Sequence, residues 1–573
     1  MREREHLSAA IFGRIMQQHG DDPSTAARLS AMTRASMAGS MQPYALTLDR
    51  FIDHAAKWHG SAEVVTGRAD GVSARTTYSA LRDRSRRLSG ALRSLGLELG
   101  DHFAVLAWNS QAHMECWYGA MGIGIVCHTL NPRASHTHLA GMIRQAGDLV
   151  LAVSPDLTSL AEQLMPLCPT IEHVVVLDEP GPDTPLPGCH RVRAWRYEDL
   201  LTERGQAVPW GGFDENTPAG LCFTSGTTGA AKGVTYTHRS NYLHTVHQLQ
   251  ADSCGLTSRD SVLVAVPMFH ANAWGFPFAG PAAGAKLVLP GRQQDGLSLA
   301  RLINAEGVTL GAGVATVWLG LVDHLDRTGA EVPSLERIMI GGASVPQALL
   351  DRLEERLGVR VQTSWGMTEL SPLGTATPPT ASVRRASSAG RPAIGVDLLL
   401  TDADGVPLPD QRGHEGRLRV RGASVIARYF GEDEPAVDRD GWLDTGDLAV
   451  IDGDGHVSIT GRAKDLIKSG GEWINPAEIE AIVGALPEVA LVAVIGLPHA
   501  KWGERPVLIV ELRAGAQITD DALLDALRSR VASWWLPDAV VRVAAMPLAL
   551  TGKIDKKRLR ADHGASEESR QCS

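Results

Sequence analysis

Short apolar runs alternate with amphipathic stretches along most of the chain. Residues 79–97 place Leu81, Leu88, Leu92 and Leu95 at helical spacing between arginines, which predicts a helix. Apolar runs typical of buried strands occur at residues 102–108, 148–153, 219–223, 262–266, 286–289 and 337–340. This alternation predicts an α/β fold in which mostly parallel sheets are covered by helices.

The pattern changes towards the C-terminus. Segments 417–420 and 456–459 are shorter and alternate, which predicts a small antiparallel β-barrel. Beyond Gly461 a helix is expected at 476–483, because it begins with proline and acidic residues. A smaller α+β unit is completed by a helix near 520–531 and by strands at 490–495, 506–512 and 540–543.

Composition narrows the class of protein. The chain has 573 residues, more than one hydrophobic core usually serves, so at least two domains are expected. Its net charge is −10, and without a long basic run it is not expected to bind nucleic acid. Seven scattered cysteines without a CxxC pair favour reduced thiols in a cytoplasmic enzyme. We expect no membrane span and no signal or transit peptide in residues 1–42.

Residues 224–233 read Thr-Ser-Gly-Thr-Thr-Gly-Ala-Ala-Lys-Gly and follow an expected strand. Glycines let the backbone approach a ligand closely, and the amides, hydroxyls and lysine can bind phosphate oxygens. Ligands usually bind at such loops in α/β sheets. The loop is not a Walker A motif, because Gly233 follows Lys232 where Ser or Thr is needed. The alternative interpretation is a flexible surface loop.

Three motifs downstream fit a nucleotide pocket. In residues 362–369 an aromatic residue can flank a base, and Glu369 can hold Mg²⁺, which prefers oxygen ligands. The Gly-Gly-Ala-Ser turn at 341–344 follows an expected strand. The Asp-Thr-Gly-Asp segment at 444–447 offers a carboxylate for a ribose diol. Taken singly, the first motif is more typical of a core tryptophan with a surface acid, the second also fits a helix cap, and the third is more typical of a turn.

Two further segments carry candidate substrate-binding residues. Residues 266–275 are apolar and aromatic with one histidine, as an acyl pocket should be. Lys553 follows a Thr-Gly turn that can deliver it into a neighbouring site, where it would neutralise charge. The alternatives are that Trp274 and His270 belong to the core and that Lys553 is one more exposed lysine.

Together and in this order, the motifs resemble those of the adenylate-forming superfamily, which includes acyl-CoA synthetases, firefly luciferases and peptide-synthetase adenylation domains. The 224–233 loop matches the family's phosphate loop except that Ala231 replaces a proline. The resemblance extends from about Met41 to Asp562. It implies an N-terminal extension (1–42), an N-terminal adenylation domain (43–463) and a mobile C-terminal domain (464–562), while the polar tail (563–573) is expected to be disordered.

The resemblance also implies roles for single residues. Lys553, Thr224 and Glu369 are expected to be catalytic, Glu369 as the Mg²⁺ ligand, and Lys464 to be the hinge. His270, Trp274 and Gly366 are expected to contact the acyl group, and Gly470 and Gly471 to border the CoA channel. ATP or AMP is expected to contact Thr224, Ser225, Gly226, Thr227, Thr228, Lys232, Gly342, Ala343, Ser344, Ser364, Trp365, Gly366, Met367, Thr368, Asp447, Arg462 and Trp473.

The implied activity is that of an ATP-dependent acid–CoA ligase, which forms an acyl adenylate and then the thioester. The Gly-Gly-Glu-Trp loop at 470–473 resembles the fatty-acyl and methylthiopropionyl branches, which favours a medium- or long-chain fatty acid. A 3-methylthiopropionate or aryl acid, loading of a carrier protein, non-catalytic nucleotide binding and luciferase-type oxygenation stay open as alternatives. The fatty-acyl relatives also imply a homodimer.

Overall fold

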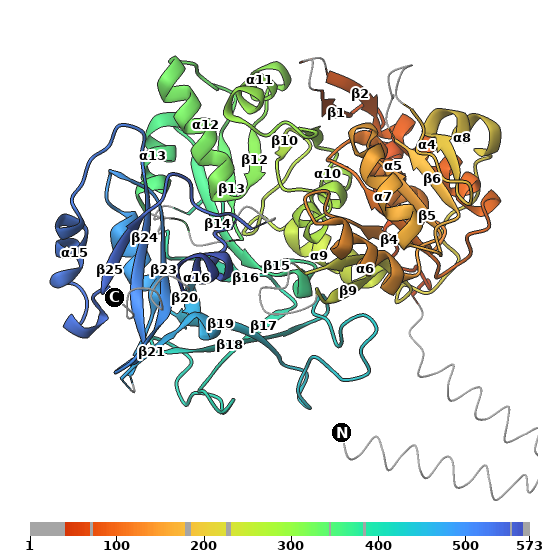
Figure 1. Cartoon of the computed structure of the whole chain (residues 1–573). Helices are drawn as coiled ribbons and strands as arrows, with labels where there is room; N and C mark the ends of the chain where they lie inside the picture. Colours follow the sequence, from red (N-terminus) through yellow and green to blue (C-terminus); the bar gives the residue numbers. More distant parts are fainter. Residues whose placement is uncertain are drawn as a thin grey trace, which may run out of the picture. The chain divides into compact units, whose positions relative to one another are not determined.

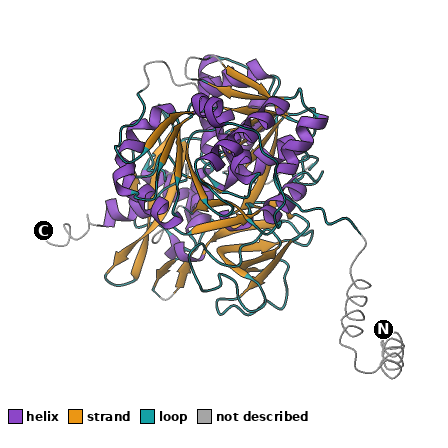
Figure 2. Ribbon diagram, turned by 90° about the vertical axis from the view of Figure 1, so that its right-hand side faces the viewer, coloured by secondary structure: helices purple, strands orange, loops and turns teal. Residues whose placement is uncertain are grey.

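The computed structural model describes residues 41–68, 71, 73–177, 185–224, 231–342, 345, 347–381, 386–470, 472–549 and 553–564. The chain forms two units, Met1–Ala45 and Leu46–Ser573, and every element named below belongs to the second. In Figures 1 and 2 its strands are flanked by helices. Within the described residues, no helix has the length and apolar character needed to cross a bilayer.

A nine-stranded sheet has the order β16-β15-β14-β13-β12-β10-β11-β1-β2. Its six central strands in that order, β14-β13-β12-β10-β11-β1, pair in parallel. These strands are β1 (Glu63–Gly67), β2 (Ser73–Thr77), β10 (Ser261–Val264), β11 (Lys286–Leu289), β12 (Leu310–Gly313), β13 (Arg337–Ile340), β14 (Arg360–Gly366), β15 (Leu373–Ala376) and β16 (Arg391–Pro392). Helices in the same part of the chain are α10 (Phe276–Ala283), α11 (Gly296–Glu306), α12 (Ala315–Thr328) and α13 (Gln347–Leu357). Figure 1 shows α12 and α13 beside β12 and β13.

A seven-stranded sheet has the order β7-β6-β5-β3-β4-β8-β9 and is parallel except for the edge strand β9, which pairs antiparallel with β8. Its strands are β3 (His102–Leu106), β4 (Val126–Thr129), β5 (Val150–Val153), β6 (His173–Val176), β7 (Arg193–Arg196), β8 (Pro218–Phe223) and β9 (Gly233–Thr237). The accompanying helices are α3 (Asp49–Trp58), α4 (Tyr78–Ser94), α5 (Gln111–Met121), α6 (His136–Ala146), α7 (Thr158–Leu164), α8 (Tyr197–Arg204) and α9 (His238–Gln248).

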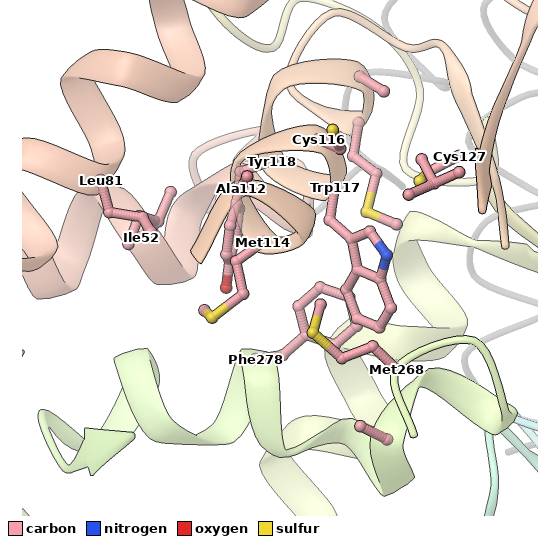
Figure 3. Packing of buried hydrophobic residues seen from close by; sticks show 14 of the residues in the cluster. Ile52, Leu81, Ala112, Met114, Cys116, Trp117, Tyr118, Cys127, Met268 and Phe278 are labelled. Carbon is pink, nitrogen blue, oxygen red and sulfur yellow. The ribbon is translucent and has the colours of Figure 1, made fainter. Parts of the chain in front are cut away.

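One apolar core joins the two large sheets. It contains Val105 and Cys127 from the seven-stranded sheet together with Val262 and Leu310 from the nine-stranded sheet. Its centre is aromatic: the rings of Trp117 on α5 and Phe278 on α10 lie 5.3 Å apart between centroids, and Met268 packs beside them (Figure 3). Burial of such large side chains contributes most to the stability of a domain of this kind.

A four-stranded antiparallel sheet follows, made of β17 (Val396–Thr401), β18 (Glu415–Gly422), β19 (Leu443–Ile451) and β20 (Val457–Arg462). The predicted antiparallel unit is therefore present, but it is an open sheet with β17 and β20 at its edges, and the predicted β-barrel was wrong in this respect. Alternation of apolar and polar residues specifies strands, whereas closure depends on pairing between the first and last strand.

The last sheet has its own core around Ile467, Ile479, Leu508 and Leu523. It is formed by β21 (Ile467–Ser469), β22 (Glu472–Ile474), β23 (Val489–His499), β24 (Gly503–Leu512) and β25 (Ala539–Arg542), with α14 (Pro476–Gly484), α15 (Asp520–Arg528) and α16 (Lys556–Gly564). The predicted α/β fold with a smaller C-terminal α+β domain is confirmed, while the domain boundaries stay a prediction. Short 3₁₀ helices, η1 to η6, lie at Pro155–Leu157, Met165–Leu167, Ala271–Gly275, Thr368–Leu370, Ala463–Asp465 and Ser533–Trp535.

Candidate active site

Most of the predicted site residues follow the carboxyl ends of parallel strands. Thr224 comes directly after β8, Gly342 comes two residues after β13, and β14 ends in Ser364, Trp365 and Gly366. Because ligands of α/β sheets bind outside the carboxyl ends of the strands, both large sheets supply residues to the edge where binding is expected.

The phosphate loop is closed as a hairpin between β8 and β9. The Thr224 N–H donates to the Lys232 carbonyl at 2.9 Å, and the Lys232 N–H donates to Thr224 Oγ1 at 3.3 Å. The Lys232 ammonium lies 4.5 Å from the centre of the Tyr429 ring. The predicted ligands Ser225, Gly226, Thr227 and Thr228 lie outside the described residues. The described ends of the loop thus present a hydroxyl and a cation beside each other.

Glu369 is held as an oxygen ligand beside this loop. Its carboxylate is buried, and Oε1 accepts a hydrogen bond from the Tyr429 hydroxyl at 2.9 Å. Burial and the neighbouring Glu369 raise the pKa of Tyr429, so its hydroxyl stays a donor. Within the described part of the chain, no hydrogen bond occupies the second carboxylate oxygen. A carboxylate with one oxygen fixed and one available, next to a phosphate loop, fits Mg²⁺.

Asp447 lies where the nucleotide's ribose is expected. Oδ2 accepts from the Trp365 indole N–H at 2.8 Å, and Oδ1 pairs with Arg462 Nε at 2.6 Å. Burial raises the pKa of Asp447, while the Arg462 charge and the Trp365 hydrogen bond oppose that rise. Asp447 and Arg462 are directly paired in the β19–β20 ladder, so the sheet register sets this contact. A buried carboxylate needs such partners to stay ionised.

Substituting asparagine for Asp447 is expected to raise the KM for ATP about tenfold, because the amide keeps the shape but loses the charge-assisted hydrogen bonds. Initial rates of AMP formation against ATP concentration would measure it. The control is Asp444→Asn, since Asp444 belongs to the same segment and is exposed. An unchanged KM for ATP in D447N would remove Asp447 from the nucleotide site.

Lys553 enters the same site from the C-terminal part of the chain. The Ala549 N–H donates to the Lys553 carbonyl at 2.6 Å. The Lys553 Cε is 3.6 Å from where a Cβ on Gly342 would stand, which is an ordinary contact distance, and the φ of +83° at Gly342 favours glycine there. Burial lowers the pKa of Lys553, as does the charge of Arg462, against the opposing effects of Asp447 and Glu369.

The acyl segment has an unusual backbone. Ala271, Asn272, Ala273 and Trp274 have φ values of 43°, 52°, 48° and 55°. This left-handed conformation is unfavourable for residues with a Cβ and is kept only where surrounding structure enforces it. The turn directs the Trp274 ring towards Gly341, where an added Cβ would lie 3.3 Å from Trp274 Cη2. The backbone therefore positions Trp274 against the nucleotide turn.

His270 and Gly366 complete this side of the site. Burial and the nearby charge of Lys553 lower the pKa of His270 to about 4, so the imidazole is neutral near neutral pH. At Gly366 a Cβ would stand 2.2 Å from the Pro372 carbonyl, so only glycine fits. His270 is therefore within the electrostatic reach of Lys553, while contact of His270 and Gly366 with an acyl group stays a prediction.

A sequence profile described as AMP-binding enzyme matches residues 51–430, and a second, described as AMP-binding enzyme C-terminal domain, matches residues 478–553. The chain belongs to the AMP-binding enzyme family. Like its family, it combines a large α/β part with a smaller C-terminal part that carries the lysine.

Curated relatives of this AMP-binding enzyme are CoA ligases. A 3-methylmercaptopropionyl-CoA ligase of Ruegeria lacuscaerulensis is 41% identical, covering 91% of this chain and 98% of that protein. A medium-chain-fatty-acid–CoA ligase of Ectopseudomonas oleovorans is 39% identical, covering 92% of this chain and 98% of that protein. The fold matches that of an anthranilate CoA ligase solved with anthranoyl-AMP, with a TM-score of 0.83 at 23% identity. The match covers 93% of this chain and 100% of that protein. The predicted class, an ATP-dependent acid–CoA ligase using ATP and CoA, is confirmed.

Some predicted residues of this AMP-binding enzyme lie elsewhere in the structure. Trp473 on β22 is 53% exposed and has the Lys468 ammonium 5.4 Å from its ring centre, instead of a neighbour in the nucleotide pocket. The Gly470 N–H donates to the Trp502 carbonyl at 2.8 Å. Lys464 lies in η5, just after Arg462. Ala343, Ser344 and Gly471 lie outside the described residues.

The structure adds residues that sequence reasoning missed. Tyr429 fixes Glu369, and the Tyr236 hydroxyl donates to the Thr368 carbonyl at 2.9 Å. Thr445 donates through Oγ1 to the Leu418 carbonyl at 2.7 Å and accepts from the Asp447 N–H at 3.1 Å. In the sequence Tyr429 and Tyr236 look like ordinary core tyrosines. Only Thr445 carried a signal, because it lies inside the recognised Asp-Thr-Gly-Asp motif.

Proposed function

We propose that this enzyme converts a medium- or long-chain fatty acid to its CoA thioester in two half-reactions at one site. The observation that carries the proposal is the position of Lys553, which lies against Gly342 and within the electrostatic reach of Asp447, Glu369 and His270. Lys553 thus brings a positive charge close to the carboxylates proposed for the ribose and the metal and to the histidine proposed for the acyl site. This is the position in which a substrate carboxylate would meet the α-phosphate of ATP.

In the first half-reaction a carboxylate oxygen attacks the α-phosphorus, a new P–O bond forms, and the bond to pyrophosphate breaks. Lys553 attracts both the attacking carboxylate and the α-phosphate, which reduces their repulsion and aligns them. Thr224 and Lys232 would hold the outer phosphates, and Asp447 with Arg462 the ribose. Mg²⁺, held through Glu369, supplies charge neutralisation at the phosphates when bound.

In the second half-reaction the CoA sulfur attacks the acyl carbonyl carbon, and AMP leaves with the electrons of the broken C–O bond. We propose that the C-terminal domain (464–562) first turns about Lys464, removing Lys553 and bringing Gly470 and Gly471 to the site. Two contacts fit such a turn: Gly470 binds Trp502 within the C-terminal part, and Arg560 on α16 pairs with Asp465 beside the hinge at 3.0 Å.

The acid itself is proposed from the character of the pocket and from the relatives. Residues 266–275 offer mainly apolar and aromatic walls, which suit an aliphatic chain. The 3-methylmercaptopropionyl-CoA ligase among the relatives favours a short thioether acid as the second candidate. An aryl acid and transfer to a carrier-protein thiol are the further alternatives.

A panel of acids with ATP, Mg²⁺ and CoA would test this function. We expect CoA-dependent thioester and AMP with straight-chain acids from propionate to stearate, with a single optimum at medium or long chain length. An optimum at 3-methylthiopropionate would replace the fatty acid by the thioether acid. AMP release without a CoA thioester would indicate transfer to a carrier protein.

Two further properties stay proposals. No disulfide joins cysteines in the part of the chain that the structure describes, which supports a reducing compartment such as the cytoplasm. A homodimer rests on the resemblance to fatty-acyl relatives alone, and light scattering during gel filtration would decide it.

A further inference from the structure

Helix α16 follows closely on the lysine that is proposed to act in adenylation. Lys553 lies three residues before Lys556, the first residue of α16. The Ala549 N–H donates to the Lys553 carbonyl at 2.6 Å, and the Asp555 N–H donates to the Pro547 carbonyl at 2.9 Å. These two hydrogen bonds tie the short segment before α16 to the segment that precedes it. A movement of the first turn of α16 would therefore be passed on to the backbone of Lys553.

An ion pair between mostly buried side chains holds that first turn. Lys556 Nζ lies 2.7 Å from Oε1 of Glu480 on α14, and the same oxygen accepts from the Val494 N–H on β23 at 2.6 Å. The Lys556 and Glu480 side chains are only 20% and 21% exposed. Figure 1 shows α16 beside β23. One carboxylate thus joins α14, β23 and the start of α16.

The surroundings of Lys553 explain why its backbone needs such an anchor. A lysine side chain loses rotamer freedom when it is held in one place. Burial lowers the pKa of Lys553, and the charges of Arg462 and Lys464 lower it further, against the attraction of Asp447 and Glu369. The two nearby cations therefore repel the ammonium group. A backbone that is free to move would let this group turn away from the site.

The later part of α16 is held by other contacts. Leu559 is fully buried in an apolar core with Ile495 and Ile509. Arg560 pairs with Asp465 at 3.0 Å. These contacts do not involve Glu480, so a change at Glu480 should displace the start of α16 without unfolding the C-terminal part. The effect on Lys553 can therefore be measured in a folded enzyme.

We propose that Glu480 is a positioning residue for the first half-reaction: through Lys556 it fixes the start of α16 and thereby holds the Lys553 ammonium at the reacting groups. This inference rests on the proposed function, because it takes Lys553 as the residue that attracts the carboxylate and the α-phosphate. Glu480 acts only through Lys553. The second half-reaction, for which Lys553 is withdrawn, is therefore independent of Glu480.

The test is Glu480→Gln, which keeps the shape of the side chain and removes its charge. We expect pyrophosphate release at saturating ATP and acid to slow about tenfold or more, because a displacement of ~1 Å can cost about 10²-fold in rate. The KM values for ATP and acid should stay unchanged, since this variant alters no group assigned to their binding. Thioester formation from synthetic acyl-AMP and CoA should proceed at the wild-type rate.

Substitutions of the partner lysine separate the ion pair from general effects of mutation. Lys556→Met should slow the first half-reaction as Glu480→Gln does, whereas Lys556→Arg keeps the pair and should retain most of the rate. The matched control is Lys557→Met, which removes the same charge from the exposed neighbouring position and should leave both half-reactions unchanged. If Glu480→Gln does not fold, the two Lys556 variants carry the same comparison.

Combination with Lys553→Ala shows whether Glu480 acts through Lys553. In that background, Glu480→Gln should slow the first half-reaction no further, because two residues that act through one group are not additive. The same loss in both backgrounds would overturn the proposal, and so would equal loss of both half-reactions or a wild-type rate in Glu480→Gln. Failure of the proposed function would appear separately, as a wild-type rate of adenylation in Lys553→Ala alone, and would overturn this inference with it.

Discussion

Lys553→Ala is expected to slow formation of the acyl adenylate by about 10²–10³-fold, the usual effect of removing one group that stabilises charge in a transition state. The side chain lies beside Gly342 and within electrostatic reach of the carboxylates of Asp447 and Glu369. Reaction of preformed acyl-AMP with CoA should proceed at the wild-type rate, because Lys553 would leave the site before that step.

The two half-reactions can be measured separately, the first by pyrophosphate release and the second by thioester formation from synthetic acyl-AMP. Lys557→Ala, which removes an exposed lysine from the same surface run, is the control and should leave both rates unchanged. Equal loss of both half-reactions in K553A would contradict the proposed withdrawal of Lys553. Because the pKa of Lys553 is lowered, the first half-reaction should also weaken at a less alkaline pH than a free lysine would impose.

Acidification from pH 6.5 towards pH 4 is expected to lower the free energy of unfolding steeply. Burial lowers the pKa of His113 to about 4 and of His238 and His244 to about 3. Unfolded histidine titrates near 6.5, so below that value the unfolded chain binds more protons and stability falls with falling pH. Each histidine contributes at most about 1.4 kcal/mol for each pH unit, and the three together about 4 kcal/mol.

The geometry explains why these rings stay neutral. His238 Nδ1 accepts from the Leu48 N–H at 3.2 Å, and His244 Nε2 accepts from the Leu373 N–H at 2.9 Å. A proton on either nitrogen would face the backbone N–H that now donates to it. In His113 the Nδ1–H donates to the Trp108 carbonyl at 3.0 Å, so a second proton would go to Nε2, which is buried without a hydrogen-bond partner among the described residues.

Urea unfolding at several pH values would measure this dependence. His244→Gln retains an acceptor for the Leu373 N–H but does not titrate, so its stability should fall about 1.4 kcal/mol less for each pH unit than that of the wild type. His414→Gln, at an exposed position, is the control and should keep the wild-type slope. Equal slopes in wild type and H244Q would show that His244 does not govern the acid response.

The sequence predicted the elements better than the contacts between them. The runs at 286–289 and 337–340 coincide with β11 and β13, because apolar runs of this length are buried wherever a parallel sheet is covered on both faces. The helix expected at 79–97 is α4, which ends earlier, at Ser94. Propensity does not specify such ends, since the last turn of a helix depends on what caps it.

In the candidate site, too, the sequence predicted single residues better than the contacts between them. Motif order indicated Glu369, Asp447 and Lys553, and the structure brings the two carboxylates within electrostatic reach of Lys553. Their supporting contacts, from Tyr429 to Glu369 and from Trp365 to Asp447, join residues 60 and 82 positions apart. The local sequence does not specify contacts between residues so far apart in the chain, because these contacts depend on how separate sheets pack together. The exposed position of Trp473 was missed for the same reason.

Asn109, the residue after Trp108, ties the two large sheets together. Its amide donates to the carbonyls of Val264 and Val266 at 2.9 Å and 2.8 Å, and its oxygen accepts from the Met268 N–H at 2.7 Å. The segment so held leads directly to His270 and Trp274. A shift of the acyl wall would therefore displace Trp108, and the reverse holds equally. Any energetic linkage between acid and ATP affinity through this amide must be reciprocal, each ligand altering the other's dissociation constant by the same factor.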